Sequence, residues 1–388
     1  MELLTRKINY FIKTETVLCI AFIAAVLTMV IIQPSAKYIT YIDFRVLSLL
    51  FSLMAVVAGF NKTGVFIHLC EKLLKKVHNT RSLSFVLIML CFFTSMWITN
   101  DVALLTFVPF AILLLTMTKQ TKYIIFVIVL QTIAANLGSM LTPVGNPQNL
   151  FLYSFYRVPI NEFMKITFPY TVFSFLLLSA LVFTVKKEAL NFELPQYEPV
   201  EKKNQKWLIA LYSVLFLVCL ACVLRLIDYR ITLLIVAAVI LLFDRSVIMK
   251  VDYSLLLTFV CFFVFVGNIG HITIIKDFLA DLIKGRELLM SVVASQGISN
   301  VPAAVLLSAF TNDYKSLIIG TNIGGLGTLV ASLASLISYK IYCKSEDAKP
   351  GKFLKTFTIY NIIFLIALLL FYKFGHYMIY LFLIFLLI

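Results

Sequence analysis

The chain has 388 residues, of which 61% are hydrophobic and only 13% are charged. Apolar runs of roughly 18 or more residues recur along its length without the alternating strands of a barrel, so we predict an all-α polytopic membrane protein. The net charge of +14 does not indicate nucleic acid as a partner, because the lysines and arginines lie mainly in short loops, where they set topology.

Spans are predicted at 17–33, 45–61, 123–153, 169–185, 207–226, 231–243, 251–267, 314–340 and 355–372, and a short apolar segment at 376–388 leaves a further crossing open. The basic N-terminal segment lacks a cleavage site and precedes a span that we expect to be retained. If two further apolar runs, 83–117 and 288–310, each enter and leave the membrane by the same face, all the basic clusters lie on one side of the membrane. The positive-inside rule places the N-terminus and the polar linker 186–206 in the cytoplasm, and we expect a bacterial cytoplasmic membrane.

The run 83–117 carries Thr99, Asn100 and Asp101 at its centre. A charged Asp in the middle of a spanning helix costs roughly 2.5 to 3.5 kcal/mol on insertion scales, so something must offset that cost. Two interpretations remain open from this run alone. It could form an ordinary turn between two spans, with its polar residues in external water, or a re-entrant hairpin whose tip stops inside the membrane.

The next segment, 123–153, is interrupted at its centre by ANLGSMLTPVGNPQN, residues 135–149. Pro143 and Pro147 each remove a backbone donor and clash with the preceding turn. Carbonyl groups freed at such a break coordinate small cations, while the N-terminal ends of half-helices favour anions. In the later segment 314–340, the stretch GTNIGGLGT at 320–328 interrupts the helix with glycines. Close helix packing alone would explain Gly324 and Gly325, but not the asparagines at membrane depth.

The second run, 288–310, breaks at Gly297, Ser299, Asn300 and Pro302. Its arms of about ten residues are about 15 Å long as helices and cannot each cross a core about 30 Å thick. We therefore predict a re-entrant hairpin with its tip near mid-membrane. The first run occupies the matching place in the chain, and this symmetry favours re-entry there too.

The two halves resemble each other. Residues 136–153 and 322–339 share Asn, Gly, Thr, Val, Leu and Tyr in register. Each half also contains a span ending in Gly and Asn, an amphipathic segment (65–74 and 275–283), a hairpin and an interrupted helix. The amphipathic segments are expected to lie in the membrane interface, although surface loops with helical character are an alternative. We predict inverted-topology repeats at 1–185 and 207–388.

The motifs TNDVALLTFVP, ANLGSMLTPVGNPQN, SNVPAAV and GTNIGG resemble the ion transporter superfamily, which includes divalent anion:sodium symporters, citrate-transporter-like permeases and arsenite pumps. Thr99 and Asn100, and likewise Ser299 and Asn300, match the first two places of that superfamily's Ser-Asn-Thr tip signature. The third place is Asp101 in one tip and Val301 in the other, which resembles the arsenite-pump and permease branches. The resemblance implies an elevator mechanism and a homodimer.

These observations predict a secondary transporter that moves a small anion, a carboxylate or an inorganic oxyanion, and is coupled to Na⁺ or H⁺. No enzyme, metal site or cofactor is expected: GxxxxGK[ST] is absent, the four histidines are scattered, and the CxxC at Cys219 lies in an apolar run. Rival functions are arsenite or antimonite efflux, Na⁺/H⁺ antiport, and an ion channel. The predicted ion-binding residues are Thr99, Asn100, Asp101, Asn136, Ser299, Asn300 and Asn322. The predicted substrate-binding residues are Thr142, Gly145, Asn146, Pro147, Asn149, Val301, Pro302, Thr321, Gly324 and Thr328.

Overall fold

A computed structural model describes residues 15–74, 77–190 and 205–387. Apart from one isolated β-bridge between Asn79 and Ala189, the regular elements in these ranges are helical. Eight of the described helices are long and apolar enough to cross a membrane. This agrees with the predicted polytopic helical class. Most of the predicted linker, 191–204, and the basic N-terminal segment 1–14 lie outside the described residues.

The elements of the first half are α2 (Thr16–Ile31), α3 (Tyr38–Tyr41), α4 (Phe44–Lys62), α5 (Val65–Leu74), α6 (Thr80–Ile98), α7 (Asn100–Met117), η1 (Thr121–Tyr123), α8 (Ile124–Ser139), α9 (Pro147–Phe155) and α10 (Ile160–Val182). Those of the second half are α11 (Gln205–Val223), α12 (Tyr229–Phe243), η2 (Arg245–Lys250), α13 (Tyr253–Gly270), α14 (Thr273–Ile283), α15 (Glu287–Ile298), α16 (Asn300–Ser308), α17 (Tyr314–Gly324), η3 (Leu329–Ala331), α18 (Leu333–Cys343) and α19 (Pro350–Leu387).

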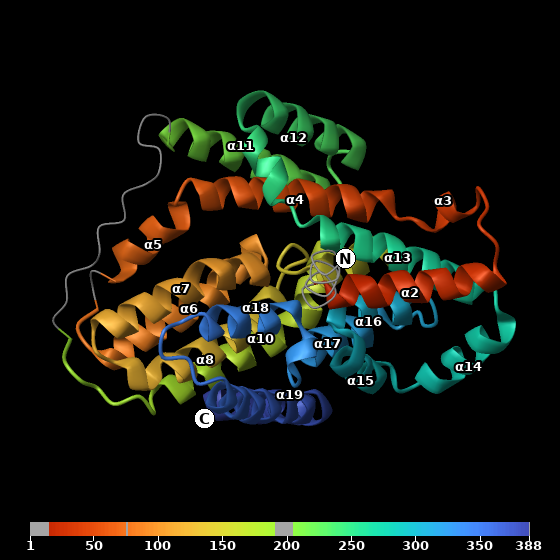
Figure 1. The fold of residues 1–388 in the computed structure, drawn as a ribbon. Coiled ribbons are helices and arrows are strands. Elements are labelled where there is room, and N and C mark those ends of the chain that lie inside the picture. The colour runs from red at the N-terminus through yellow and green to blue at the C-terminus, as the bar shows by residue number, and fades with distance from the viewer. Residues whose placement is uncertain (1–14, 75–76, 191–204, 388) are drawn as a thin grey trace, which may run out of the picture.

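The peripheral helices turn large apolar side chains outward. Val30 of α2 is 79% exposed, Leu217 of α11 is 63% exposed and Leu234 of α12 is 69% exposed. A surface of this kind is costly in water and is matched by lipid chains. Figure 1 shows α11 and α12 together beside α4 at one edge of the molecule and α19 at the opposite edge.

Two apolar cores meet at the interrupted helices, with α8 packed in the first core and α9 in the second. One core is built mainly from α6, α7, α8 and the described part of α19, and the other from α4, α11, α12 and α13. Helix α17 contributes to both, because Ile318 packs in the second core and Ile319 in the first. The interrupted helices, which are predicted to carry the site, therefore lie where the two cores meet. We call the first core with its helices the hairpin body, and the second core with α4, α11, α12 and α13 the other body.

Both predicted hairpins consist of two helices joined by a single residue. Thr99 joins α6 to α7 with φ 65° and ψ 145°, and Ser299 joins α15 to α16 with φ 73° and ψ 154°. This backbone region is almost restricted to glycine and costs of order 1–3 kcal/mol for other residues. Two tips of different sequence thus share one strained conformation. The arms of the first hairpin are long enough to cross a membrane, whereas those of the second, 12 and 9 residues, are not.

The two interrupted helices break where the prolines and glycines predict. Helix α8 ends at Ser139 and α9 begins at Pro147, whose missing N–H is harmless at the first helical position. The Asn146 side chain caps α9 by accepting from the Asn149 N–H at 2.9 Å. In the second half, α17 ends at Gly324 and α18 begins at Leu333, with Gly327 at φ 107° between them.

Three expectations concern elements outside the hairpins. The segments 65–74 and 275–283 are helical within α5 and α14, which lie at opposite ends of the molecule (Figure 1). Their place in the membrane interface remains a prediction. The prediction that 355–372 and 376–388 are separate segments is wrong, because one helix, α19, runs through 350–387. The single glycine between them, Gly375, costs about 1 kcal/mol against Ala and does not end a helix.

Candidate functional site

The tip of the first hairpin is bound to the first interrupted helix. The N–H of Asn100 donates to the carbonyl oxygen of Gly145 at 3.0 Å, and its side-chain amide donates to Oδ1 of Asn136 at 3.0 Å. Asn100 and Asn136 are both buried. The tip is therefore buried against a protein partner, and the cost of placing polar groups in the apolar run is offset by hydrogen bonds within the protein.

Asp101 follows at the first turn of α7. Its N–H donates to Oδ1 of Asn100 at 3.0 Å, and the positive end of the α7 dipole favours its carboxylate. Oδ1 of Asp101 is buried and has no hydrogen-bond partner among the described residues. A buried carboxylate oxygen of this kind indicates a place for a cation or proton.

Several carbonyl groups released at the two breaks are already used by amide side chains. Asn149 donates to the carbonyl oxygens of Ser139, Met140 and Thr142 at 3.2–3.4 Å. Gln296 of α15 does the same for Gly324 and Leu326, both at 2.9 Å. These carbonyl groups can bind an ion only if the amides move. Gln296 was missed in the sequence, where it had no recognisable motif around it.

Hydrogen bonds also join the two interrupted helices across the halves of the chain. Asn146 donates to Oδ1 of Asn322 at 3.0 Å, and Ser332 donates to Oδ1 of Asn136 at 3.0 Å. In the register that aligns the two halves, Asn136 corresponds to Asn322 and Asn146 to Ser332. The two bonds are therefore equivalent. Asn322 further donates to Oδ1 of Asn149 at 2.6 Å.

The remaining predicted hydroxyl groups bond to the backbone. Thr142 donates to Met96, Thr321 to Leu317, and Thr328 to Gln296. Gly324 packs against α15, because a Cβ added there would lie 2.7 Å from Oγ of Ser295. In these contacts the residues hold neighbouring backbone and helices in place. That they also bind substrate directly remains a prediction.

Two cavities border this network. The first, about 210 Å³, is lined by Asn100, Asp101, Pro147, Ser299, Asn300, Val301, Pro302 and Ser332, together with residues of α13 and α18. The second, about 390 Å³, is lined by Thr99, Asp101, Asn146 and Pro147, and by Asn61, Lys62, Lys250 and Asp252 from the other body. Asn136, Asn149, Asn322, Thr142, Gly145, Thr321, Gly324 and Thr328 line neither cavity.

Six helix N-termini border the 210 Å³ cavity. Its lining includes the N-cap residue of α13, Asp252, and the first residues of α2, α7, α9, α16 and α18, which are Thr16, Asn100, Pro147, Asn300 and Leu333. Each N-terminus carries about half a positive charge, and several together favour an anion. Asp252 was missed in the sequence, where it looks like an ordinary cap before the apolar run of α13.

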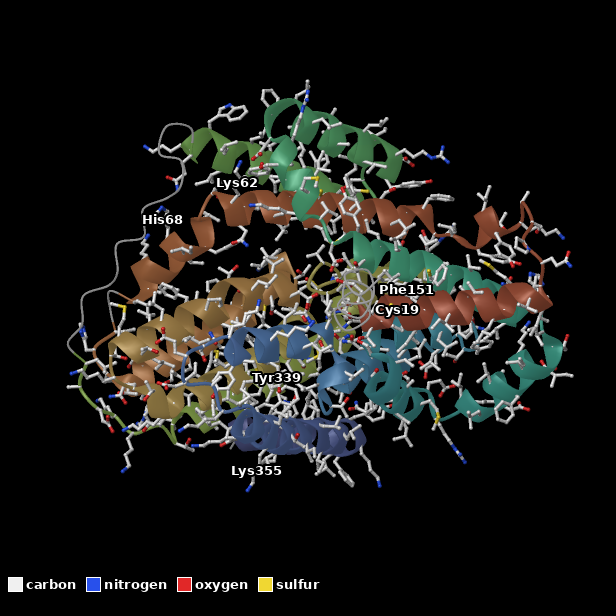
Figure 2. All side chains as sticks on the ribbon, viewed as in Figure 1. Cys19, Lys62, His68, Phe151, Tyr339 and Lys355 are labelled. Atoms are coloured by element: carbon white, nitrogen blue, oxygen red, sulfur yellow. The ribbon has the colours of Figure 1, made fainter. Side chains whose placement is uncertain are left out.

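A charged cluster adjoins the second cavity through Lys62, which is part of its lining. Lys62, labelled at the end of α4 in Figure 2, lies 3.0 Å from the carboxylate of Asp244, which also accepts from Tyr212 and Ser246. Burial alone would raise the pKa of Asp244, but these hydrogen bonds from Ser246, Lys62 and Tyr212 hold it below its ordinary value. Among the described residues, His, Cys, Asp and Glu nowhere form a group of three that could hold a metal ion.

A helical protein with a lipid-compatible surface and buried polar breaks beside internal cavities defines an integral membrane transporter. A family model described as a citrate transporter matches residues 4–314. The chain therefore belongs to the citrate transporter family.

Individual relatives agree with this assignment. An uncharacterized transporter of Methanocaldococcus jannaschii is 32% identical over 366 residues, which cover 93% of this chain and 99% of the relative. The inner membrane protein YbiR of Escherichia coli is 30% identical over 77% of this chain and 80% of its own length. A low-affinity phosphate transporter of Saccharomyces cerevisiae is 30% identical over only 29% of this chain and 13% of its own.

Proposed function

We propose that this protein is a secondary active transporter that carries a small carboxylate or inorganic oxyanion and is coupled to a Na⁺ or H⁺ gradient. The observation that carries the proposal is the meeting of six helix N-termini at one cavity beside two hairpin tips. Helix N-termini favour an anion, and in this proposal the coupling ion offsets the three acids of the same lining, Glu15, Asp101 and Asp252. The citrate transporter family and the phosphate-transporting relative support the same substrate class.

We assign different tasks to the two tips. Ser299, Asn300 and the start of α16 provide a neutral tip suited to an anion. Thr99, Asn100 and Asp101 provide a tip with one carboxylate, suited to the coupling ion. In this proposal Asn136 and Asn322 hold the tips and breaks in place through the equivalent bonds to Ser332 and Asn146.

The transport cycle is proposed to be an elevator movement in an inverted-repeat protein that forms a homodimer. The equivalent hydrogen bonds of the two halves and the shared backbone strain at Thr99 and Ser299 support the repeat. The two separate apolar cores support movement of one body against the other. Re-entry of both hairpins is supported by the burial of Asn100 and by the short arms of the second hairpin.

Uptake by proteoliposomes tests the function. Purified protein should accumulate radiolabelled citrate or phosphate when an inward Na⁺ or pH gradient is imposed, and should lose accumulation when the gradient is collapsed. Uptake that equilibrates without a gradient would indicate a channel. An outwardly directed flux of Na⁺ in exchange for protons, without anion movement, would indicate antiport.

Asp101→Asn separates symport from cation antiport. In the proposed symporter, this variant should lose gradient-driven accumulation but still exchange labelled anion for unlabelled anion, because the neutral tip is intact. A cation antiporter should lose all cation flux. Coupled accumulation at the wild-type level would remove Asp101 from the coupling site.

A further inference from the structure

Among the residues that the structure describes, the two cavities share four lining residues: Asp101, Pro147, Asp252 and Leu255. Two of these are carboxylates, and they come from different bodies. Asp101 lies at the first turn of α7, in the hairpin, and Asp252 lies at the N-cap of α13, in the other apolar core. Both carboxylates line both cavities. Two acids, one from each body, therefore lie where the two cavities adjoin.

Each carboxylate retains an oxygen for a ligand. Oδ1 of Asp252 accepts the N–H of Leu255 at 2.9 Å, and its Oδ2 has no hydrogen-bond partner among the described residues. Oδ1 of Asp101 is buried without a partner, as described above. Asp252 is exposed to solvent, whereas Oδ1 of Asp101 is buried. The two like charges that border the same cavities repel each other, and a cation bound between them would relieve that repulsion.

None of the lysines that line the two cavities forms an ion pair with Asp101 or Asp252 in the described part of the structure. Lys62 is paired with Asp244, and neither Lys250 nor Lys340 forms a salt bridge with Asp101 or Asp252. Glu15 adds a further acid to the lining of the 210 Å³ cavity. Carboxylate oxygens are the ligands that hard cations prefer.

We propose that Asp252 is the second carboxylate of a Na⁺ site shared with Asp101, so that the coupling ion is bound between the hairpin and α13. The inference rests on the proposed function and deepens it. Because the two acids belong to different bodies, the site is complete only when α7 and α13 are in the present arrangement. Relative movement of the bodies would separate Asp252 from Asp101, so that the moving tip would carry the ion without Asp252 and release it more readily after the movement.

The test is a Na⁺ titration of thermal unfolding in detergent, with choline chloride holding the ionic strength constant. A ligand that binds only the folded state raises the unfolding temperature in a saturable way. Asp252→Asn should need about tenfold more NaCl for half of the full shift, because one charged ligand is lost. Asp101→Asn should show no saturable shift.

Asp228→Asn is the matched control. Asp228 caps α12 through the Arg230 N–H at 2.8 Å, and it lines neither of the two cavities that share the acid pair. Asn caps helices about as well as Asp, so both cap variants should fold. The Asp228→Asn titration should superimpose on the wild type. In uptake assays, Asp252→Asn should raise the Na⁺ concentration for half-maximal rate and keep the rate at saturating Na⁺.

The outcomes separate this inference from the function. If Asp101→Asn abolishes the Na⁺ response while Asp252→Asn behaves like Asp228→Asn, Asp252 is only a helix cap and the shared site is wrong, although symport stands. If the wild type shows no Na⁺ response but accumulates anion under a pH gradient, the Na⁺ site is wrong and H⁺-coupled transport stands. If no gradient drives accumulation, the function itself fails.

Discussion

At the scale of single residues, the most informative positions are the two tip residues that precede Asn100 and Asn300. Thr99 and Ser299 adopt the same backbone region, with φ 65° and 73°, although glycine would adopt it without strain. The side chains that cause the strain also line the cavities, Thr99 one and Ser299 the other. The protein therefore keeps a hydroxyl group at each tip at a cost in stability.

Replacing Thr99 with glycine should raise the free energy of unfolding by about 1 kcal/mol, because release of strain exceeds the extra entropy of glycine. Thr99→Ala is the control, since it keeps Cβ and the strain. Ser299→Gly should gain less, because Oγ of Ser299 also contacts the carbonyl oxygen of Ala331 at 3.4 Å. Thermal unfolding in detergent measures the stability of all three variants. Equal stabilities for Thr99→Gly and Thr99→Ala would show that the backbone conformation at Thr99 does not lower the free energy of unfolding.

The buried pair of Lys62 and Asp244 predicts a pH dependence. The pKa of Asp244 is lower in the folded protein than its ordinary value, so its contribution to stability is full above the ordinary range, near pH 4, and is lost as the pH falls through the folded value. Asp244→Asn should lose about 1–3 kcal/mol at neutral pH. The difference from the wild type should shrink below about pH 4.

Glu188→Gln is the control for this effect. Glu188 pairs with Lys122 at 2.7 Å, but both side chains are well exposed to solvent. Exposed pairs contribute about 0–1 kcal/mol, so Glu188→Gln should change the unfolding temperature little at any pH. A pH-independent difference between Asp244→Asn and the wild type would mean that the carboxylate charge does not stabilise the fold.

At the scale of elements, glycine positions the first interrupted helix against the first hairpin. A Cβ added to Gly138 of α8 would lie 2.1 Å from the carbonyl oxygen of Phe92 in α6. Backbone atoms cannot move aside as a flexible side chain can, so the two helices would have to separate. The close contact of α8 with α6 in turn sets the distance from Asn136 to Asn100.

Gly138→Ala should therefore destabilise the protein by about 1–3 kcal/mol and reduce gradient-driven uptake. Gly351→Ala is the matched control, because a Cβ at Gly351 in α19 meets nothing within 4 Å. That change should be neutral or stabilise by up to about 1 kcal/mol. Thermal unfolding and uptake measured on both variants check the prediction, which fails if the two alanine variants are equally stable.

The elements were largely predictable from the sequence, and the contacts between them were not. Proline at 147 and the glycines after 320 indicated both interruptions, and the apolar runs indicated the hairpins. Asp252 and Gln296 were missed because a capping Asp and a helical Gln carry no local signal. The fold alone brings them to residues far along the chain: Asp252 lines the same cavities as Asp101, and Gln296 donates to the carbonyl oxygen of Leu326.

At the scale of the whole molecule, the proposed elevator requires that the body containing α7 moves against the body containing α4. Oγ1 of Thr106 in α7 lies 3.4 Å from Oδ1 of Asn61 in α4, so the two bodies touch beside the 390 Å³ cavity. A covalent link at this contact would hold the bodies in the present arrangement. Movement during transport must break the contact.

Crosslinking Asn61→Cys to Thr106→Cys with a short, cleavable, thiol-specific reagent should therefore stop gradient-driven uptake, and cleavage of the linker should restore it. The Asn61→Cys and Thr106→Cys single variants, treated with the same reagent, show how much uptake is lost when the seven native cysteines are modified without a crosslink between the bodies. Lys122→Cys with Glu188→Cys is the matched pair, because these residues form an ion pair on the hairpin side of the molecule and should tolerate a link. Uptake at the wild-type rate in fully crosslinked Asn61→Cys/Thr106→Cys protein would exclude movement of α7 against α4 and would favour a channel.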